Sequence, residues 1–223
     1  MGKSYKFTYF DMRGLGEQVR LGEQVRLLLV DNNIPFEEKR FTKEEDTEWQ
    51  KLKVKLPFGQ LPTLQDDDEL IAQSGAIMRH LARKHDLYGK NESERTYADM
   101  VYDSMKDWHS VYAKTVYCGD QNFEELREKY LTTILPRALS AFTTFLNRYD
   151  NGEHFVLGNK ISFVDYTLFE ELDCHLRLDS SCLKDYPLLA AFHSRMNQRP
   201  SLQNHLMKRA TSNVPVNWSG NAN

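Results

Sequence analysis

Two short segments of this chain carry residue types that could bind a small peptide: Pro57-Phe58-Gly59-Gln60-Leu61-Pro62-Thr63-Leu64 and Gln73-Ser74-Gly75-Ala76-Ile77. The Leu61-Pro62 bond can be cis, because proline lowers the trans preference to about 0.5–1 kcal/mol, and Pro62 donates no backbone hydrogen bond. A proline here interrupts strand pairing and leaves the Leu61 backbone available to an outside peptide. Gln73 and Ser74 precede a helical run, and a helix N-terminus attracts carboxylates. Together the segments predict a site that holds a small peptide by its backbone and by a carboxylate.

Strands and helices alternate along the part of the chain that must position these segments. Strands are expected where β-forming residues alternate, and helices where apolar residues recur with helical spacing. The expected order is a strand at 6–10, a helix at 14–30, a strand at 34–41, a charged helix at 44–55, a hairpin at 63–71 and a helix at 76–84. This β-α-β-α-β-β-α order predicts an α/β sandwich domain of about 80 residues.

The chain beyond Glu92 has helical periodicity and few strand signals. The polar, turn-like segment from His85 to Asn91 marks a linker. We therefore expect an α/β domain over residues 4–87 and an all-helical domain over residues 89–213. Within the second domain, Ser162-x-x-Asp165 ahead of an apolar run is typical of a capping box at a helix N-terminus.

A tandem repeat follows the first expected strand: Leu15-Gly16-Glu17-Gln18-Val19-Arg20 recurs at once as Leu21-Gly22-Glu23-Gln24-Val25-Arg26. Six residues rotate an α-helix by about 600°, a net 240°, and lengthen it by about 9 Å. One helix through both copies would not keep a single buried face. We expect one copy to pack on the sheet and the other to form a loop or irregular extension, because loop-closure entropy grows only logarithmically with length. The sequence does not decide which copy packs.

The composition argues against several classes of function. The 223 residues include 29 basic and 32 acidic side chains, a net charge of −3, which disfavours binding to nucleic acid or to an acidic membrane surface. No apolar run approaches the roughly 20 residues of a membrane span, and the N-terminus lacks the apolar stretch of a signal peptide. Three cysteines without a CxxC motif favour a reduced, cytoplasmic protein. His80 and His85 lack the spacing of a helical zinc site, so no metal is expected.

The chain resembles the cytosolic glutathione transferases, most of all the pi class in its invertebrate form, from about Tyr5 to Val216. The motifs that carry the resemblance are Tyr9-Phe10-x-x-Arg13-Gly14, Phe58-Gly59-Gln60-Leu61-Pro62, Gln73-Ser74-Gly75-Ala76-Ile77, Ile161-Ser162-Phe163-Val164-Asp165-Tyr166 and the tail Val214-Pro215-Val216-Asn217. The resemblance implies a thioredoxin-like N-terminal domain, an all-helical C-terminal domain and a homodimer. It also implies an enzyme of detoxification that conjugates reduced glutathione, as co-substrate and without a further cofactor, to apolar electrophiles.

The resemblance also implies roles for individual residues. Tyr9 would donate a hydrogen bond to the glutathione thiolate, which lowers the pKa of the thiol because the bond favours its charged form. Further glutathione contacts would come from Trp49, Lys53, Gln60, Leu61, Gln73 and Ser74, and from Asp107 reaching across the dimer. The electrophile pocket would be lined by Phe10, Met12, Tyr112 and Tyr117, and the aromatic inserted into the partner would be Phe58.

Plainer interpretations exist for the same residues. Taken alone, Tyr9 is a buried strand aromatic, Gln73-Ser74 a helix cap and Lys53 a solvated charge. The repeat is not part of the family pattern, and Leu56 stands where many pi enzymes carry an oxidisable cysteine. Two other functions stay open: a sigma-like, glutathione-dependent prostaglandin isomerase, and a non-catalytic binding or structural protein in which the repeat splays the site behind Tyr9.

Overall fold

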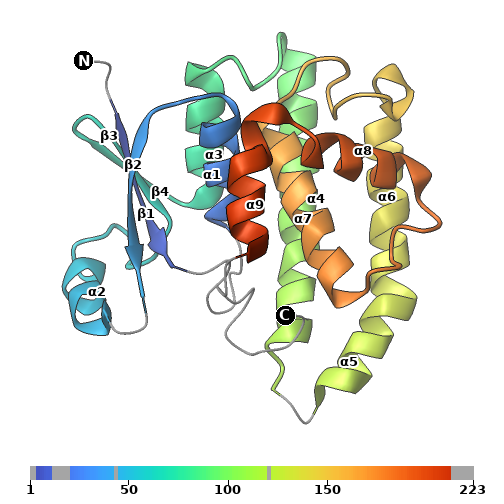
Figure 1. Cartoon of the computed structure of the whole chain (residues 1–223), viewed down its shortest axis with the longest axis horizontal. Helices are drawn as coiled ribbons and strands as arrows, with labels where there is room; N and C mark the ends of the chain where they lie inside the picture. The colour runs from blue at the N-terminus through green and yellow to red at the C-terminus, as the bar shows by residue number, and fades with distance from the viewer. Residues whose placement is uncertain (1–3, 12–20, 43–44, 120–121, 212–223) are drawn as a thin grey trace.

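The computed structural model describes residues 4–11, 21–42, 45–119 and 122–211. The first part of the chain follows the predicted order of strands and helices (Figure 1). Its elements are β1 (Tyr5–Phe10), α1 (Glu23–Asp31), β2 (Phe36–Phe41), α2 (Asp46–Lys53), β3 (Thr63–Asp66), β4 (Glu69–Ala72) and α3 (Ser74–Lys84).

These strands form one mixed sheet in the order β2-β1-β3-β4. β1 runs parallel to β2 and antiparallel to β3, and β3 and β4 form the predicted hairpin. Tyr5, Phe7 and Tyr9 alternate with more exposed residues along β1, so one face of this strand enters the core. Figure 1 shows α1 and α3 between the sheet and the remaining helices, whereas α2 lies apart from them.

The rest of the described chain is helical. It comprises α4 (Glu92–Val116), α5 (Phe123–Lys129), a π-helical turn (Tyr130–Ile134), α6 (Leu135–Asn147), α7 (Phe163–Leu178), α8 (Pro187–Asn197) and α9 (Gln203–Thr211). The capping box predicted at α7 is present: Asp165 accepts hydrogen bonds from the Ser162 backbone at 2.8 Å and from the Ser162 hydroxyl at 2.7 Å. Among the described residues, no helix has the length and apolar character needed to cross a membrane.

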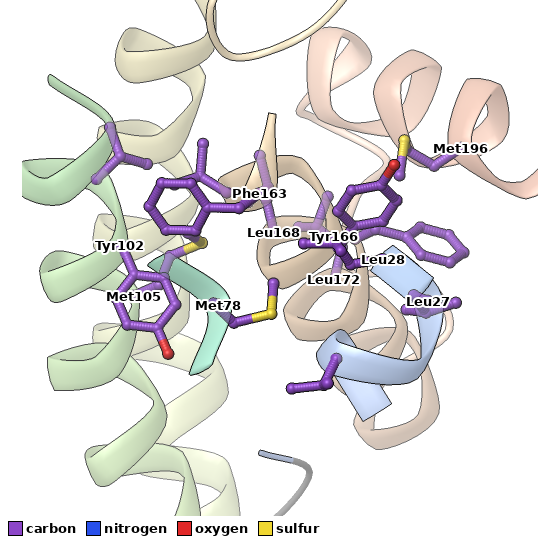
Figure 2. Packing of buried hydrophobic residues seen from close by; sticks show 14 of the residues in the cluster. Leu27, Leu28, Met78, Tyr102, Met105, Phe163, Tyr166, Leu168, Leu172 and Met196 are labelled. Atoms are coloured by element: carbon purple, nitrogen blue, oxygen red, sulfur yellow. The ribbon is translucent and has the colours of Figure 1, made fainter. Parts of the chain in front are cut away.

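One apolar core joins the two parts of the chain. Helix α7 is buried on most of its surface and packs against α1, α4 and α8. Figure 2 shows this junction, where side chains of α1, α3, α4, α7 and α8 meet: Leu27, Leu28, Met78, Tyr102, Met105, Phe163, Tyr166, Leu168, Leu172 and Met196. The helical part thus fixes the position of α1, and through α1 the end of the sheet that carries Tyr9.

Helix α1 begins within the second copy of the repeat. Its first residue is Glu23, and Leu21 and Gly22 form a turn, so the helix expected from residue 14 starts later within the described chain. The first copy, Leu15–Arg20, lies outside the described residues. The second copy meets the expectation that one copy packs on the sheet, because its Arg26 lies over the rings of Phe7 and Tyr9 in β1.

Polar side chains fix the register of this first helical turn. Glu23 pairs with His205 of α9 at 2.7 Å, and Arg26 pairs with Glu38 of β2 at 2.5 Å. The side chain of Gln24 accepts a hydrogen bond from the Thr167 hydroxyl of α7 at 2.6 Å. Three residues of the repeat are therefore held by three different elements.

Candidate functional site

Tyr9 lies near the end of β1 in a closely packed environment and is only 2% exposed. Its ring lies 6.4 Å from the ring of Phe7 and 5.8 Å from that of Phe10, measured between centroids. The Arg26 guanidinium lies 5.5 Å from the centroid of the Tyr9 ring. On another side is Gly22, where an added Cβ would lie 2.4 Å from Cδ1 of Tyr9. The second copy of the repeat therefore forms part of the wall around this phenol.

This environment keeps the Tyr9 hydroxyl protonated. Burial raises the pKa of Tyr9, because a phenolate would lose its hydration, and the nearby phenol of Tyr117 acts in the same direction. The Arg26 charge and a hydrogen bond from the Gly22 backbone oppose the rise in pKa without cancelling it. At neutral pH the phenol is thus an O–H donor, the state needed to stabilise an anion beside it.

The two peptide-binding segments predicted from the sequence meet at one end of the sheet. The Leu61-Pro62 bond is cis, and the Gln73 amide donates to the Gln60 side-chain oxygen at 3.4 Å. Gln73 has φ 69°, a left-handed conformation that is uncommon for a residue other than glycine. The next residue, Ser74, begins α3 and is buried, with its hydroxyl 3.5 Å from the Tyr102 hydroxyl. The structure thus brings together four of the predicted glutathione contacts, including the loop residue Leu61.

Helix α2 places two further predicted residues beside this site. Trp49 packs its ring against Phe10, with centroids 5.0 Å apart, and against Phe41, with centroids 6.0 Å apart. Lys53 is exposed, and its aliphatic stem lies next to Gly59 in the loop before Gln60. Trp49 thereby connects α2 to the strand of Tyr9, and Lys53 borders the loop.

The four residues predicted to line an electrophile pocket fall into different places. Phe10 is half-buried between Tyr9 and Trp49. Tyr117 follows the last residue of α4 and is near enough to influence the pKa of Tyr9. The third residue, Tyr112, is fully buried in the helical part, where its ring packs against His109, Tyr130 and His175. Met12 lies outside the described residues.

Asp107 and Phe58, the residues predicted to act across a dimer, are both exposed. Asp107 lines a groove of about 530 Å³ between α4 and α6, whose walls also include Trp108, Val111 and Phe145. Phe58 stands in the loop before β3 and is 63% exposed. The structure therefore presents an exposed aromatic side chain and an apolar groove on the same molecule.

A second cavity, of about 200 Å³, lies where α1, α3, α4 and α7 meet. Gln73 and Ser74 line it together with His109, Lys106 and Glu171. His109 Nδ1 lies 2.8 Å from a carboxylate oxygen of Glu171, and both side chains are buried. This cavity therefore adjoins two of the predicted glutathione-binding residues.

One exposed group of side chains offers atoms suited to a cation. Ligand atoms of Asp150, Glu153 and His154 lie within 4.8 Å of one another. Exposed acidic groups of this kind are common without a metal, and these residues are distant in sequence from the site around Tyr9.

Comparison with known proteins decides the family. A family model described as the glutathione S-transferase N-terminal domain matches residues 5–83, and one described as the C-terminal domain matches residues 106–209. Glutathione S-transferase 2 of Onchocerca volvulus is 46% identical over 217 residues, which cover 97% of this chain and 99% of that protein. The chain belongs to the glutathione S-transferase family.

One further relative and one solved structure indicate the class of this glutathione S-transferase. Glutathione S-transferase P of Caenorhabditis elegans is 44% identical over 215 residues, covering 96% of this chain and 98% of that protein. The solved structure of the Onchocerca volvulus Pi-class glutathione S-transferase matches with a TM-score of 0.89 and 45% identity, covering 98% of this chain and 99% of that chain. The predicted resemblance to the pi class and the predicted fold, a thioredoxin-like domain followed by an all-helical domain, are confirmed.

Sequence reasoning missed several residues that surround the site of this glutathione S-transferase. Gly22 and Arg26, both in the second copy of the repeat, lie against Tyr9, and a local pattern does not show that contact. His109 and Glu171 are 62 residues apart in the chain and form a pair only because α4 packs on α7. The only sequence signal for such a pair is the rarity of charged residues on a buried helix face, which requires the fold to be known.

Proposed function

We propose that this glutathione S-transferase conjugates reduced glutathione to electrophilic small molecules, with Tyr9 stabilising the glutathione thiolate. The observation that carries this proposal is the placement of a buried, protonated phenol at the end of β1, on the same sheet as the Gln60-Leu61 loop and the start of α3. The nucleophile belongs to glutathione, and the protein supplies its ionisation and its position.

The proposed reaction begins with loss of the thiol proton to solvent. The Tyr9 hydroxyl donates a hydrogen bond to the resulting thiolate, which is stronger than a bond to the neutral thiol. The thiolate sulfur then attacks an electrophilic carbon, a carbon–sulfur bond forms, and a leaving group such as chloride departs with the bonding electrons. A free thiol has a pKa near 8.5, so at neutral pH each unit by which the pKa falls raises the thiolate fraction about tenfold while most of the thiol is still protonated.

The remaining residues hold the tripeptide for this step. The backbone of Leu61 and the side chain of Gln60 bind the cysteinyl part, and Gln73 and Ser74 bind the γ-glutamyl carboxylate at the N-terminus of α3. Trp49 and Lys53 bind the glycyl end. Bringing the sulfur next to the electrophile is itself a large part of such catalysis. Phe10 and Tyr117 line the electrophile pocket, whereas Tyr112 is fully buried within the helical part and Met12 lies outside the described residues.

We further propose that the protein acts as a homodimer in the cytoplasm. Phe58 of each protomer enters the groove between α4 and α6 of the other, because a 63% exposed aromatic and an apolar groove of about 530 Å³ are complementary. Asp107 lines that groove and would reach the partner's glutathione. The division into domains over residues 4–87 and 89–213 is part of the same proposal.

The test of this function is Tyr9→Phe. We expect kcat/KM for glutathione and 1-chloro-2,4-dinitrobenzene to fall about 10- to 100-fold, the value of one hydrogen bond to a charged group. Retention on immobilised glutathione should persist, and the pH profile of kcat/KM should move to higher pH because the thiol pKa is no longer lowered. Tyr5→Phe is the matched control, because Tyr5 lies on the same face of β1 and its hydroxyl contacts His85 instead.

The outcomes separate the alternative functions. Unchanged turnover and pH profile in Tyr9→Phe would contradict the role of Tyr9. Wild-type protein that is retained by glutathione without turnover would be a binding protein on this scaffold. The similarity to pi-class enzymes favours conjugation over prostaglandin isomerisation, and the isomerase alternative is checked by supplying a prostaglandin endoperoxide in place of the aryl halide.

A further inference from the structure

A line of buried ion pairs connects helix α9 to the phenol of Tyr9. Its outer member is Arg209 of α9, whose side chain is 6% exposed and whose Nη1 lies 3.4 Å from Oε1 of Glu23. The second carboxylate oxygen of Glu23 lies 3.2 Å from Nη1 of Arg26. The Arg26 guanidinium lies 5.5 Å from the centroid of the Tyr9 ring. Charged side chains of α9 and α1 therefore lead from the C-terminal helix to the proposed catalytic residue (Figure 1).

Arg26 is held on several sides at the inner end of this line. Its Nε donates to Glu38 of β2 at 2.5 Å, and its Nη2 donates at 3.4 Å to the backbone oxygen of Phe10, the residue after Tyr9. A cation over an aromatic ring is attracted to the face of that ring. Burial raises the pKa of Tyr9, and the Arg26 charge is the largest influence that lowers it. The guanidinium thus makes the phenol a better donor to a thiolate, because it stabilises the negative charge that such a bond places on the phenol oxygen.

Glu23 opposes this effect unless positive charge balances its own. The Glu23 charge adds to the rise in the pKa of Tyr9 that burial causes. Its side chain is 4% exposed, so water screens the charge only weakly. Two groups of α9 face the Glu23 carboxylate, His205 at 2.7 Å and Arg209 at 3.4 Å. Of these two, only Arg209 is charged at every physiological pH. The charge balance beside Tyr9 therefore depends on α9.

Helix α7 fixes the position of Arg209. Its Nη1 donates to Glu170 at 2.5 Å, and its Nη2 donates to Asp173. The guanidinium also lies 6.0 Å from the centroid of the Phe169 ring. A planar guanidinium can bind several carboxylates at once through different N–H groups, which the single ammonium of lysine does less well. The helical part of the chain thus sets the position of Arg209, and the contact with Glu23 carries that position to α1.

We propose that Arg209 is a positioning residue of the reaction, which acts through Glu23 to keep the Arg26 guanidinium over the Tyr9 ring and so sustains ionisation of the glutathione thiol. This inference rests on the proposed function. Because Arg209 acts through two other side chains, its loss should alter the ionisation of the thiol and leave the binding of the tripeptide unchanged.

The test compares Arg209→Gln with Arg209→Lys. Both substitutions remove the planar guanidinium, but only Arg209→Gln removes the positive charge beside Glu23. The measurement is a pH titration of the complex with glutathione, followed by the ultraviolet absorbance of the thiolate. We expect the thiol pKa to rise by about 0.5 unit in Arg209→Gln and by less than half as much in Arg209→Lys. Below the thiol pKa, kcat/KM for 1-chloro-2,4-dinitrobenzene at saturating glutathione should fall about threefold in Arg209→Gln. The dissociation constant of S-methylglutathione, which has no thiol, should not change.

Arg177→Gln is the matched control. Arg177 lies on α7 and pairs with Asp173 at 3.4 Å, so this substitution removes the same charge from the same group of acids and leaves the ion pair between Arg209 and Glu23 intact. The thiol pKa should stay at its wild-type value. An equal rise in Arg177→Gln would assign the effect to net charge and would overturn the proposal.

Other results would also overturn it. An unchanged thiol pKa in Arg209→Gln, with lower stability in urea unfolding, would leave Arg209 a purely structural role. Equal rises in Arg209→Gln and Arg209→Lys would assign the effect to packing. Arg209→Met, which keeps aliphatic packing against Phe169, replaces Arg209→Gln if that variant does not fold. A wild-type complex whose thiol pKa equals that of free glutathione would refute the proposed function, and this inference with it. A lowered thiol pKa that the loss of Arg209 leaves unchanged would refute the inference alone.

Discussion

Gly22→Ala is the substitution that most directly tests how the repeat supports Tyr9. Gly22 has φ −85° and ψ −30°, a conformation open to any residue, so backbone strain contributes nothing to the expected effect. The expected effect comes from steric overlap between the new methyl group and the Tyr9 ring alone. A Cβ at this position would lie 2.4, 2.6 and 2.7 Å from three carbons of the Tyr9 ring.

The magnitude follows from those distances. Carbon atoms in contact normally lie about 3.5–4.0 Å apart, so the ring or the helix must move by about 1 Å. Tyr9 is 2% exposed and is enclosed by Phe7, Phe10 and Arg26, which leaves no free space for such a shift. Overpacking of this kind costs about 1–3 kcal/mol of stability. A displacement of about 1 Å at a catalytic group lowers the rate about 100-fold.

The assay measures kcat/KM with glutathione and 1-chloro-2,4-dinitrobenzene alongside urea unfolding. We expect Gly22→Ala to lose both activity and stability, with activity falling by more than unfolding at the assay temperature can explain. Gly16→Ala, in the identical hexapeptide of the first copy, is the matched control and should have the smaller effect. Wild-type activity and stability in Gly22→Ala, or equal losses in both variants, would refute the steric reasoning.

Three further predictions concern the interface, the capping box and the buried charges. Phe58→Ser should weaken the dimer by about 2 kcal/mol or more, measured by size-exclusion chromatography and sedimentation. Val54→Ser, at a side chain that is 83% exposed, should leave the dimer unchanged. An unchanged dimer in Phe58→Ser would contradict the proposed insertion. Asp165→Ala should cost about 2–4 kcal/mol in urea unfolding, because it strands buried backbone donors of Val156 and Ser162, and a loss below 1 kcal/mol would contradict this. Burial alone would raise the pKa of the Glu23 carboxyl, but hydrogen bonds and charges from α9 and α1 outweigh burial and hold this pKa well below its usual range. The stability that the Glu23 charge contributes is therefore present above about pH 4.3, the pKa of a free glutamate, and is lost as pH falls through the folded pKa. Glu23→Gln should therefore cost about 3–5 kcal/mol at pH 7 and progressively less in acid, and a constant difference across pH would argue against the charge.

Much of the fold was predictable because its signals are local. Alternation along β1, the turn between β3 and β4, and the sequence Ser162-x-x-Asp165 each depend on residues within a few positions of one another. The break near the repeat was also predictable, since a helix continued through six extra residues rotates its apolar face by a net 240°. The structure added which copy forms the helix: α1 begins at Glu23, where side-chain contacts to three other elements are available.

The surroundings of the site were not predictable from local patterns. The pair of His109 and Glu171 depends on two helices that meet only after the chain has folded, and the position of Arg26 beside the Tyr9 ring depends on the register of α1. The full burial of Tyr112 has the same origin, because its neighbours come from helices on both sides of α4. Sequence motifs therefore located the loop and the helix start that are proposed to bind glutathione, and they did not reveal the residues packed beneath them.

The side-chain contacts that hold the first turn of α1 have a consequence for a version of the chain without one hexapeptide. The two hexapeptides are identical and adjacent, so removing either yields the same 217-residue polypeptide (223 minus 6). That shorter chain keeps a glutamate, a glutamine and an arginine directly ahead of Leu27, at the positions that bind His205 of α9, Thr167 of α7 and Glu38 of β2. A single deletion clone can therefore reveal what the extra six residues add, free of any ambiguity about which copy was excised.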